Sequence, residues 1–127
     1  EEELLPIRSE FVLASRFGDL EPPIDTVFIH IKEHNAYLKS CQNVLKLGFQ
    51  GKMCIHPDQV AVTNETFTPS EEEVVWSKRV ISEFERAEAE GVASIQVDGY
   101  FVDYPIVEKA QRVVDMSNLL NDLASSK

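Results

Sequence analysis

The sequence predicts an α/β fold in which helices connect two parallel strands. Two segments are expected to be strands: 24–31, which is rich in β-branched and aromatic residues, and 51–56, a short apolar run that breaks at His56-Pro57. A helical pattern over 35–47 separates them, and another helical pattern precedes the first run. The order helix, strand, helix, strand is that of βα units, whose crossover makes neighbouring strands parallel.

Glycines mark the ends of the two helices in the first half of the chain. Residues 3–17 carry apolar side chains at loose helical spacing, and Gly18 follows them. Residues 35–47 have a clearer apolar face, and Gly48 follows that pattern. A glycine in this place typically ends a helix, so each is expected to lead toward the next strand.

A capping box predicts where the long helix of the second half begins. Ser70 stands three residues before Glu73, which allows each side chain to bond the other residue's backbone amide. The helix is expected to continue to about Glu90, with Gly91 as its left-handed end. Between Pro57 and this box we expect only a turn or two of helix.

A hairpin and a last helix complete the predicted elements. Asp98-Gly99 lies between the apolar triplets 95–97 and 100–102, a pairing typical of a two-residue hairpin turn. Pro105 then fits the first turn of a helix, and the residues after it form a wide apolar face.

Composition narrows the class of partner. The 127 residues carry a net charge of −10, from 22 acidic and 12 basic side chains, which disfavours nucleic acid and anionic membranes as partners. No apolar run is long enough to predict a transmembrane helix. Cys41 and Cys54 lack a CxxC spacing and are interpreted as small buried thiols in a reducing compartment.

The two predicted strands are apolar on both faces, although two strands alone cannot make a well-covered parallel sheet. We therefore expect the chain to be part of a larger α/β structure, or to pair with another chain.

Four motifs carry a family resemblance. The segments IDTV, LGFQGKMCIHPDQV, NETFTPS and DGYFVDYP, in this order, resemble the C-terminal part of the citrate lyase β-subunit-like family. That family includes the malyl-CoA and citramalyl-CoA lyases. The likeness runs from about Pro6 to Leu123, so it covers nearly the whole chain.

The resemblance implies a fold. The chain would be the C-terminal part of a (β/α)8 TIM barrel, with the last two parallel strands and their helices, plus a helical C-terminal extension with a short hairpin. Residues 1–68 would be the barrel part. Residues 69–127 would be the helix and the extension, which acts as a lid on a neighbouring subunit of a homotrimer or hexamer.

The resemblance also implies an activity, which is magnesium-dependent cleavage of a carbon–carbon bond in a β-hydroxyacyl-CoA of the malyl-CoA or citramalyl-CoA type. The products would be an acyl-CoA and a 2-oxo acid. The Mg2+ ligands are expected upstream of this chain. Two alternatives stay open: a citrate lyase β subunit acting on a citryl thioester of an acyl-carrier protein, and a non-catalytic assembly module. A cytoplasmic location is expected, with the mitochondrial matrix as the alternative.

By resemblance the catalytic residue is Asp103, as the group that exchanges a proton with the thioester's α-carbon. From residue type alone, Asp103 is better interpreted as only the N-cap of the last helix, and the resemblance is what favours catalysis. The resemblance also places Ile55, His56 and Pro57 near the CoA thioester, although a His56 that only holds its loop is an open alternative. Lys52 is expected to be solvated at the opposite end of the barrel.

The chain departs from the family pattern at His30, where an acidic residue is common, while Glu33 fills a second acidic position. His30 and His34 are four residues apart, but they lie across a strand-to-loop junction and no third ligand is evident. Residues 100–101 replace a Lys-Met pair that is frequent in the family. These departures leave the acyl substrate open.

Overall fold

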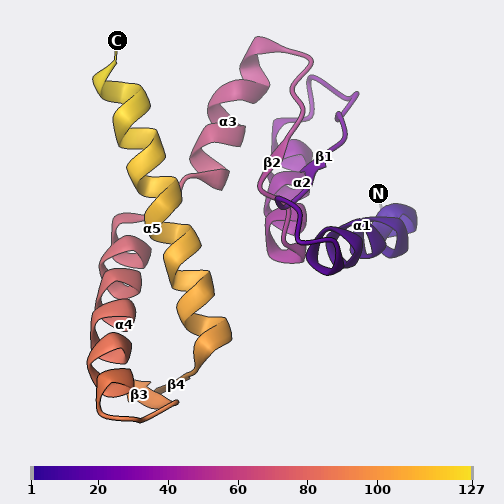
Figure 1. Cartoon of the computed structure of the whole chain (residues 1–127). Helices are drawn as coiled ribbons and strands as arrows, with labels where there is room; N and C mark the ends of the chain where they lie inside the picture. The colour runs from indigo at the N-terminus through magenta and orange to yellow at the C-terminus, as the bar shows by residue number, and fades with distance from the viewer. Residues whose placement is uncertain (1, 127) are drawn as a thin grey trace. The chain divides into compact units, whose positions relative to one another are not determined.

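The computed structural model describes residues 2–126, which form two compact units that meet in sequence at Phe67 and Thr68 (Figure 1). Each unit is described by itself. In chain order the elements are the 3-10 helix η1 (Glu2–Leu4), α1 (Leu5–Phe17), β1 (Ile24–Asp25), α2 (His34–Leu47), β2 (Gly51–Lys52), α3 (Pro57–Phe67), α4 (Glu71–Ala89), β3 (Ile95–Val97), β4 (Tyr100–Val102) and α5 (Tyr104–Ser125). No helix within residues 2–126 has the length and apolarity needed to cross a membrane.

The first unit contains the predicted parallel pair. β1 and β2 run parallel, with Ile24 opposite Gly51 and Asp25 opposite Lys52. Each strand has two residues, so the strands predicted over 24–31 and 51–56 are much shorter than expected. The β-branched residues of 24–31 favour an extended chain, but a strand also needs a neighbouring backbone with which to pair, and that pairing stops after Lys52. The chain is therefore mixed α/β with few strands.

Helix α2 is placed as the sequence predicts, and Gly48 ends it in the left-handed conformation with φ 108°. Helix α3 is a difference, because it has 11 residues where one or two turns were expected. Phe28, Tyr37 and Cys41 form the buried cluster between these helices, and Val62 and Phe67 of α3 pack against it. Contacts with this cluster and the burial of Gln59 and Thr63 extend along α3 from its first turn to Phe67.

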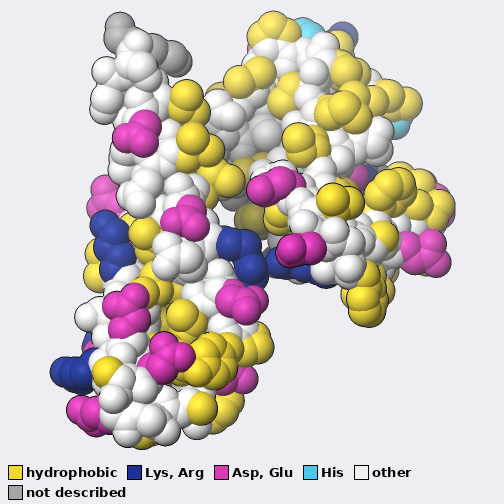
Figure 2. Space-filling view, in the orientation of Figure 1, with side chains coloured by type: hydrophobic (Ala, Val, Ile, Leu, Met, Phe, Trp, Pro, Cys, Tyr) yellow, Lys and Arg dark blue, Asp and Glu magenta, His cyan; other side chains and the backbone are white. Residues whose placement is uncertain are grey.

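Many apolar side chains of the first unit remain exposed, and Figure 2 shows such side chains at the surface. Exposed large apolar side chains on or beside the two strands are Ile24, Ile29, Ile31, Met53 and Ile55. A soluble protein rarely leaves strand residues of this kind without a covering element.

In the second unit, α4 and α5 pack along each other, and the β3–β4 hairpin connects them at one end (Figure 1). Its core consists of Val80, Phe84, Val97, Val102 and Ala110. The hairpin is antiparallel with Val97 opposite Tyr100, as predicted, and Asp98 and Gly99 have φ angles of 50° and 83°. These positive values at both turn positions match the turn that Asp-Gly favours.

The capping box of α4 is also confirmed. The Ser70 hydroxyl accepts from the Glu73 amide at 3.2 Å, and the Glu73 carboxylate accepts from the Ser70 amide at 2.9 Å. Helix α4 ends at Ala89, and Gly91 follows with φ 82°. Local sequence thus determines both ends of this helix.

Candidate functional site

Asp103 lies at the junction between β4 and α5. Its backbone is extended, with φ −132° and ψ −176°, and its Oδ1 accepts a hydrogen bond from the Ile106 amide at 3.4 Å. Val102, directly before it, is completely buried, while the Asp103 side chain is half-buried. The N-cap interpretation of Asp103 is therefore confirmed.

As an N-cap, the Asp103 carboxylate still has oxygen lone pairs that can interact with a ligand. A carboxylate has two oxygens and about four acceptor positions, and the cap uses one of them through a long hydrogen bond. The remaining oxygen of a half-exposed group can accept or return a proton. The same residue can thus begin α5 and face a ligand.

The segment 55–57 joins β2 to α3. The Ile55 amide donates to Gln59 Oε1 at 2.9 Å, and Pro57 is the first residue of α3. His56 Nδ1 accepts from the Asp58 amide at 3.3 Å and lies 3.5 Å from Asp58 Oδ2. His56 therefore makes the loop contacts that the alternative interpretation expected, and its ring is still partly exposed.

Gln59 is a residue that sequence reasoning missed. Its side chain is buried, and its Nε2 donates to the Phe28 carbonyl at 2.9 Å while its Oε1 accepts from Ile55. One amide thus connects the segment that follows β1 with the segment that follows β2. A Gln three positions after His56 carries a weak signal for this role, because Gln on a first helical turn is common.

A hydroxyl–thiol cluster lies beside this loop. The Tyr37 hydroxyl is 2.6 Å from Thr63 Oγ1 and 3.5 Å from Cys54 Sγ, which is itself 3.3 Å from Thr63 Oγ1. Burial and the hydrogen bond with Cys54 raise the pKa of Tyr37 above its ordinary value. Cys41 is buried as predicted, but Cys54 is exposed, which corrects the expectation for that thiol. The ladder ends at Lys52, so Cys54 no longer belongs to a covered strand.

Three buried charges, Arg8, Asp25 and Lys52, lie at the last residue pair of the ladder. Arg8 donates from Nε and Nη2 to the two Asp25 oxygens, each at 2.9 Å, and Lys52 Nζ donates to Asp25 Oδ2. Burial opposes ionisation of Asp25, but the hydrogen bonds from Arg8 and Lys52 outweigh it and hold the pKa of Asp25 below its ordinary value. The expectation of a solvated Lys52 is wrong, since its side chain is 0% exposed.

His30 is exposed, with Nδ1 3.8 Å from Glu33 Oε1. Within residues 2–126, no group of three or more His, Cys, Asp or Glu side chains is arranged to hold a metal ion. The described part of the chain therefore does not fit a magnesium site.

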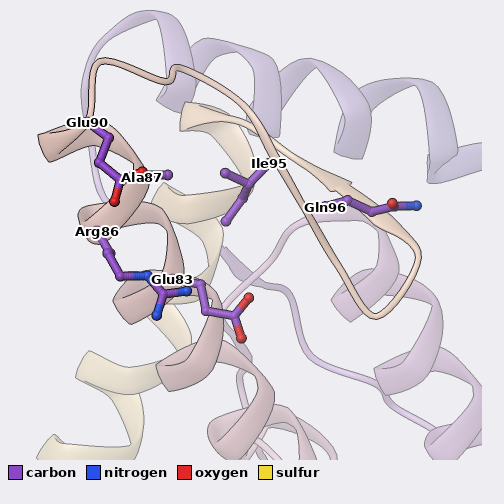
Figure 3. A pocket seen from close by; sticks show the side chains of 6 residues that line it. All are labelled: Glu83, Arg86, Ala87, Glu90, Ile95 and Gln96. Atoms are coloured by element: carbon purple, nitrogen blue, oxygen red, sulfur yellow. The ribbon is translucent and has the colours of Figure 1, made fainter.

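A shallow pocket of about 240 Å3 lies between α4 and the hairpin (Figure 3). The residues that line it are Glu83, Arg86, Ala87, Glu90, Ile95 and Gln96. Two carboxylates, Glu83 and Glu90, accompany the single cation Arg86, so the pocket's charge disfavours an anionic cofactor.

Asp103 belongs to the second unit and the segment 55–57 to the first, so the candidate residues come from two separate parts of the chain. Asp103 and the segment 55–57 are each positioned by contacts within their own unit.

No family model matches the chain. Among curated proteins, it is 33% identical over 126 residues to the citrate lyase subunit beta of Leuconostoc mesenteroides subsp. cremoris, covering 99% of this chain and 41% of that protein. It is 28% identical over 121 residues to a mitochondrial citramalyl-CoA lyase of Rattus norvegicus, covering 95% of this chain and 36% of that protein. It is 31% identical over 97 residues to an L-malyl-CoA/beta-methylmalyl-CoA lyase of Rhodobacter capsulatus, covering 76% of this chain and 30% of that protein.

Solved structures share the fold. The crystal structure of the protein CitE from Mycobacterium tuberculosis, in complex with magnesium, acetoacetate and coenzyme A, aligns with a TM-score of 0.70 and 23% identity, over 88% of this chain and 40% of that one. A citrate lyase from Burkholderia xenovorans LB400 aligns with a TM-score of 0.68 and 14% identity, over 90% of this chain and 35% of that one.

The chain spans about two fifths or less of the length of these relatives. Their names are those of the family that the four motifs indicated. The resemblance is thereby confirmed, and the chain belongs to the citrate lyase β-subunit-like family, matching a part of the length of its members.

Proposed function

We propose that the protein to which this chain belongs is a magnesium-dependent carbon–carbon lyase. It cleaves a β-hydroxyacyl-CoA of the malyl-CoA or citramalyl-CoA type to an acyl-CoA and a 2-oxo acid. The observation that carries the proposal is Asp103, a half-exposed carboxylate that directly follows the buried Val102 of β4 and caps the start of α5. The names of the curated relatives, all thioester or citrate lyases, support the reaction class.

The proposed reaction assigns one proton transfer to Asp103. The bond between the thioester's α-carbon and the carbon that bears the hydroxyl breaks, and its electron pair moves to the α-carbon side as an enolate. The hydroxyl loses its proton to a base elsewhere in the protein, and its carbon becomes the keto carbon of the 2-oxo acid. Asp103, in its protonated form, returns a proton to the α-carbon, and its carboxylate removes that proton in the reverse condensation.

The magnesium ion would stabilise negative charge on the oxygens of the 2-oxo acid. Because the described residues do not fit such a site, we propose that its ligands lie upstream of this chain.

We further propose that β1 and β2 are adjacent strands near the C-terminal end of a TIM barrel. The exposed apolar residues beside them support this placement, because further strands and helices of a barrel would cover them. The second unit would then be the extension that works as a lid in a homotrimer or hexamer. Ile55, His56 and Pro57, at the exit of β2, would border the CoA thioester, with His56 shaping the loop.

A second candidate is a citrate lyase β subunit that acts on a citryl thioester of an acyl-carrier protein. The observation in its favour is the 33% identity to a protein named as such a subunit. The two candidates differ in the carrier of the thioester and not in the bond that breaks.

The test uses the full-length protein that contains this chain. Cleavage of malyl-CoA, citramalyl-CoA and a citryl thioester of an acyl-carrier protein is measured with Mg2+ and with EDTA, for the wild type and for Asp103→Asn. We expect one CoA substrate to be cleaved only with Mg2+, and the variant to lose about 10²-fold or more of the turnover. Asp115→Asn, an exposed Asp on the same helix, is the control.

Near-normal turnover by Asp103→Asn would contradict the assignment of Asp103 as the catalytic residue. Cleavage of the carrier-protein thioester alone favours the second candidate. Failure to cleave any of these thioesters leaves the non-catalytic assembly module as the better description.

A further inference from the structure

The turn of the β3–β4 hairpin is fixed to α4 by an ion pair. Arg79 Nη1 donates to both carboxylate oxygens of Asp98, at 2.9 and 3.0 Å. Arg79 Nε donates to Glu83 Oε1 at 2.7 Å, which orients the guanidinium from one turn further along α4. The turn end of the hairpin therefore has a defined place on the helix.

The exit end of the hairpin is fixed to the same helix through Tyr104. Its hydroxyl donates to Glu88 Oε1 at 2.7 Å, and its ring meets the buried Phe84 ring edge-on, with centroids 5.1 Å apart. Val102 is completely buried in the core of the unit. The residues on both sides of Asp103 are thus attached to α4 or to the core.

The Asp103 side chain is held weakly. The Asp103 carbonyl accepts from the Val107 amide at 3.0 Å, but the hydrogen bond of its side chain within residues 2–126, from the Ile106 amide, is 3.4 Å long, which is beyond the usual range for this type of bond. A carboxylate that must meet a substrate carbon needs a tighter hold than this cap provides. The position of the Asp103 carboxylate must therefore be set by the backbone around residue 103, because the hydrogen bond of the side chain is too weak to set it.

We propose that Glu88 is a positioning residue for Asp103 and acts through the Tyr104 hydroxyl. The proposal rests on the proposed function, in which Asp103 exchanges a proton with the substrate. Tyr104 is 49% exposed, and its ring packs against Phe84. In this proposal the hydrogen bond to Glu88 fixes the hydroxyl end of the ring, and with it the peptide between residues 103 and 104.

The electrostatics of the contact agree with this role. The hydrogen bond to Glu88, and the charge of Glu88, raise the pKa of Tyr104 above its ordinary value. A phenol is a donor at neutral pH, and its bond to a carboxylate is charge-assisted.

Three variants of the full-length protein test the proposal by turnover. Tyr104→Phe keeps the ring on Phe84 and removes the hydroxyl, and Glu88→Ala removes the acceptor. Each should lower kcat by about 10-fold and leave KM within about 2-fold, because a misplaced acid slows the chemistry without weakening substrate binding. Glu88→Gln keeps a carbonyl acceptor and should retain most of kcat.

Two comparisons separate this role from general destabilisation. Tyr100→Phe is the matched control, since Tyr100 lies on the same hairpin, is 66% exposed, and its hydroxyl makes no hydrogen bond within residues 2–126. It should leave kcat unchanged. The double variant Tyr104→Phe/Glu88→Ala should be no slower than either single variant, because the two groups act as one unit.

A measurement independent of turnover reports on the hydrogen bond between the Asp103 side chain and the Ile106 amide. Hydrogen exchange of the Ile106 amide should be faster in Tyr104→Phe and in Glu88→Ala than in the wild type and in Tyr100→Phe. An unchanged exchange rate overturns the proposal. So does an unchanged kcat in these variants when Asp103→Asn is inactive. If Asp103→Asn turns over normally, the proposed function fails, and the exchange rates alone decide whether Glu88 holds residue 103.

Discussion

Lys52 Nζ donates a hydrogen bond to Asp25 Oδ2, and the same two residues are opposite each other in the β1–β2 ladder. Both are buried, and Arg8 completes the group with two hydrogen bonds of 2.9 Å to the carboxylate. The parallel pair is thus held by backbone pairing and by a buried charge network at the same position.

Removing the carboxylate charge should destabilise the protein strongly. Asp25→Asn leaves two buried cations without their common counter-charge, which typically costs about 3–5 kcal/mol of unfolding free energy. Urea denaturation of the full-length protein measures the loss. Asp19→Asn is the control, because Asp19 is exposed and its φ of 51° suits Asn equally well. A loss in Asp25→Asn as small as that in Asp19→Asn would contradict the role of the network.

The same carboxylate predicts a pH dependence. Its folded pKa lies below the ordinary value of 3.8, so the stability it contributes is fully present above that value. This contribution is lost as the pH falls from about 4 through the folded pKa, because the unfolded state takes up the proton first. The stability difference between wild type and Asp25→Asn should therefore be constant from pH 7 to 5 and shrink below pH 4. Denaturation midpoints across this range provide the measurement, and a difference that grows on acidification would refute the assignment.

Gly48 should resist substitution. Its φ is 108°, and an added Cβ would lie 3.1 Å from Val12 Cγ1, so Gly48→Ala should cost about 1–2 kcal/mol of stability. Gly51→Ala is the matched control, because there the added Cβ would meet only Ile24 carbons at 3.9 and 4.0 Å. Thermal or urea melts compare the two variants. Equal stability of the two would show that α2 can end without the left-handed residue.

The capping box should have a measurable effect on α4. Ser70→Ala removes the acceptor for the Glu73 amide and should lower the unfolding free energy by about 1 kcal/mol. Ser82→Ala, at an exposed position inside the same helix, should be neutral or slightly stabilising, because alanine is the better helix former. Chemical denaturation distinguishes them, and a neutral Ser70→Ala would mean that tertiary packing alone fixes the start of α4.

The elements that the sequence predicts correctly depend on local rules. The capping box at Ser70, the left-handed Gly48 and the Asp98-Gly99 turn each follow from a few neighbouring residues. The same holds for Asp103 as a cap, because its neighbour Pro105 marks the first turn of α5.

The features that sequence reasoning missed depend on residues far apart in the chain. Arg8 meets Asp25 across 17 positions, and Lys52 meets it across 27, so no local pattern announces their burial. The length of β1 and β2 is likewise set by where two backbones diverge, which side-chain propensity does not encode. The family assignment succeeded because the four motifs are specific to the family. The acyl substrate depends on other residues, which these motifs do not identify.

Beyond the short β1–β2 ladder, the side chain of Gln59 connects the two segments that backbone hydrogen bonds no longer join. By holding the Phe28 carbonyl and the Ile55 amide together, it makes the first turn of α3 a mechanical link between the two diverging segments. A displacement at either segment is transmitted to the other through a single rigid amide, since that group donates and accepts at the same time. Any ligand that moves the 55–57 loop would therefore also displace Phe28, which belongs to the buried cluster with Tyr37 and Cys41.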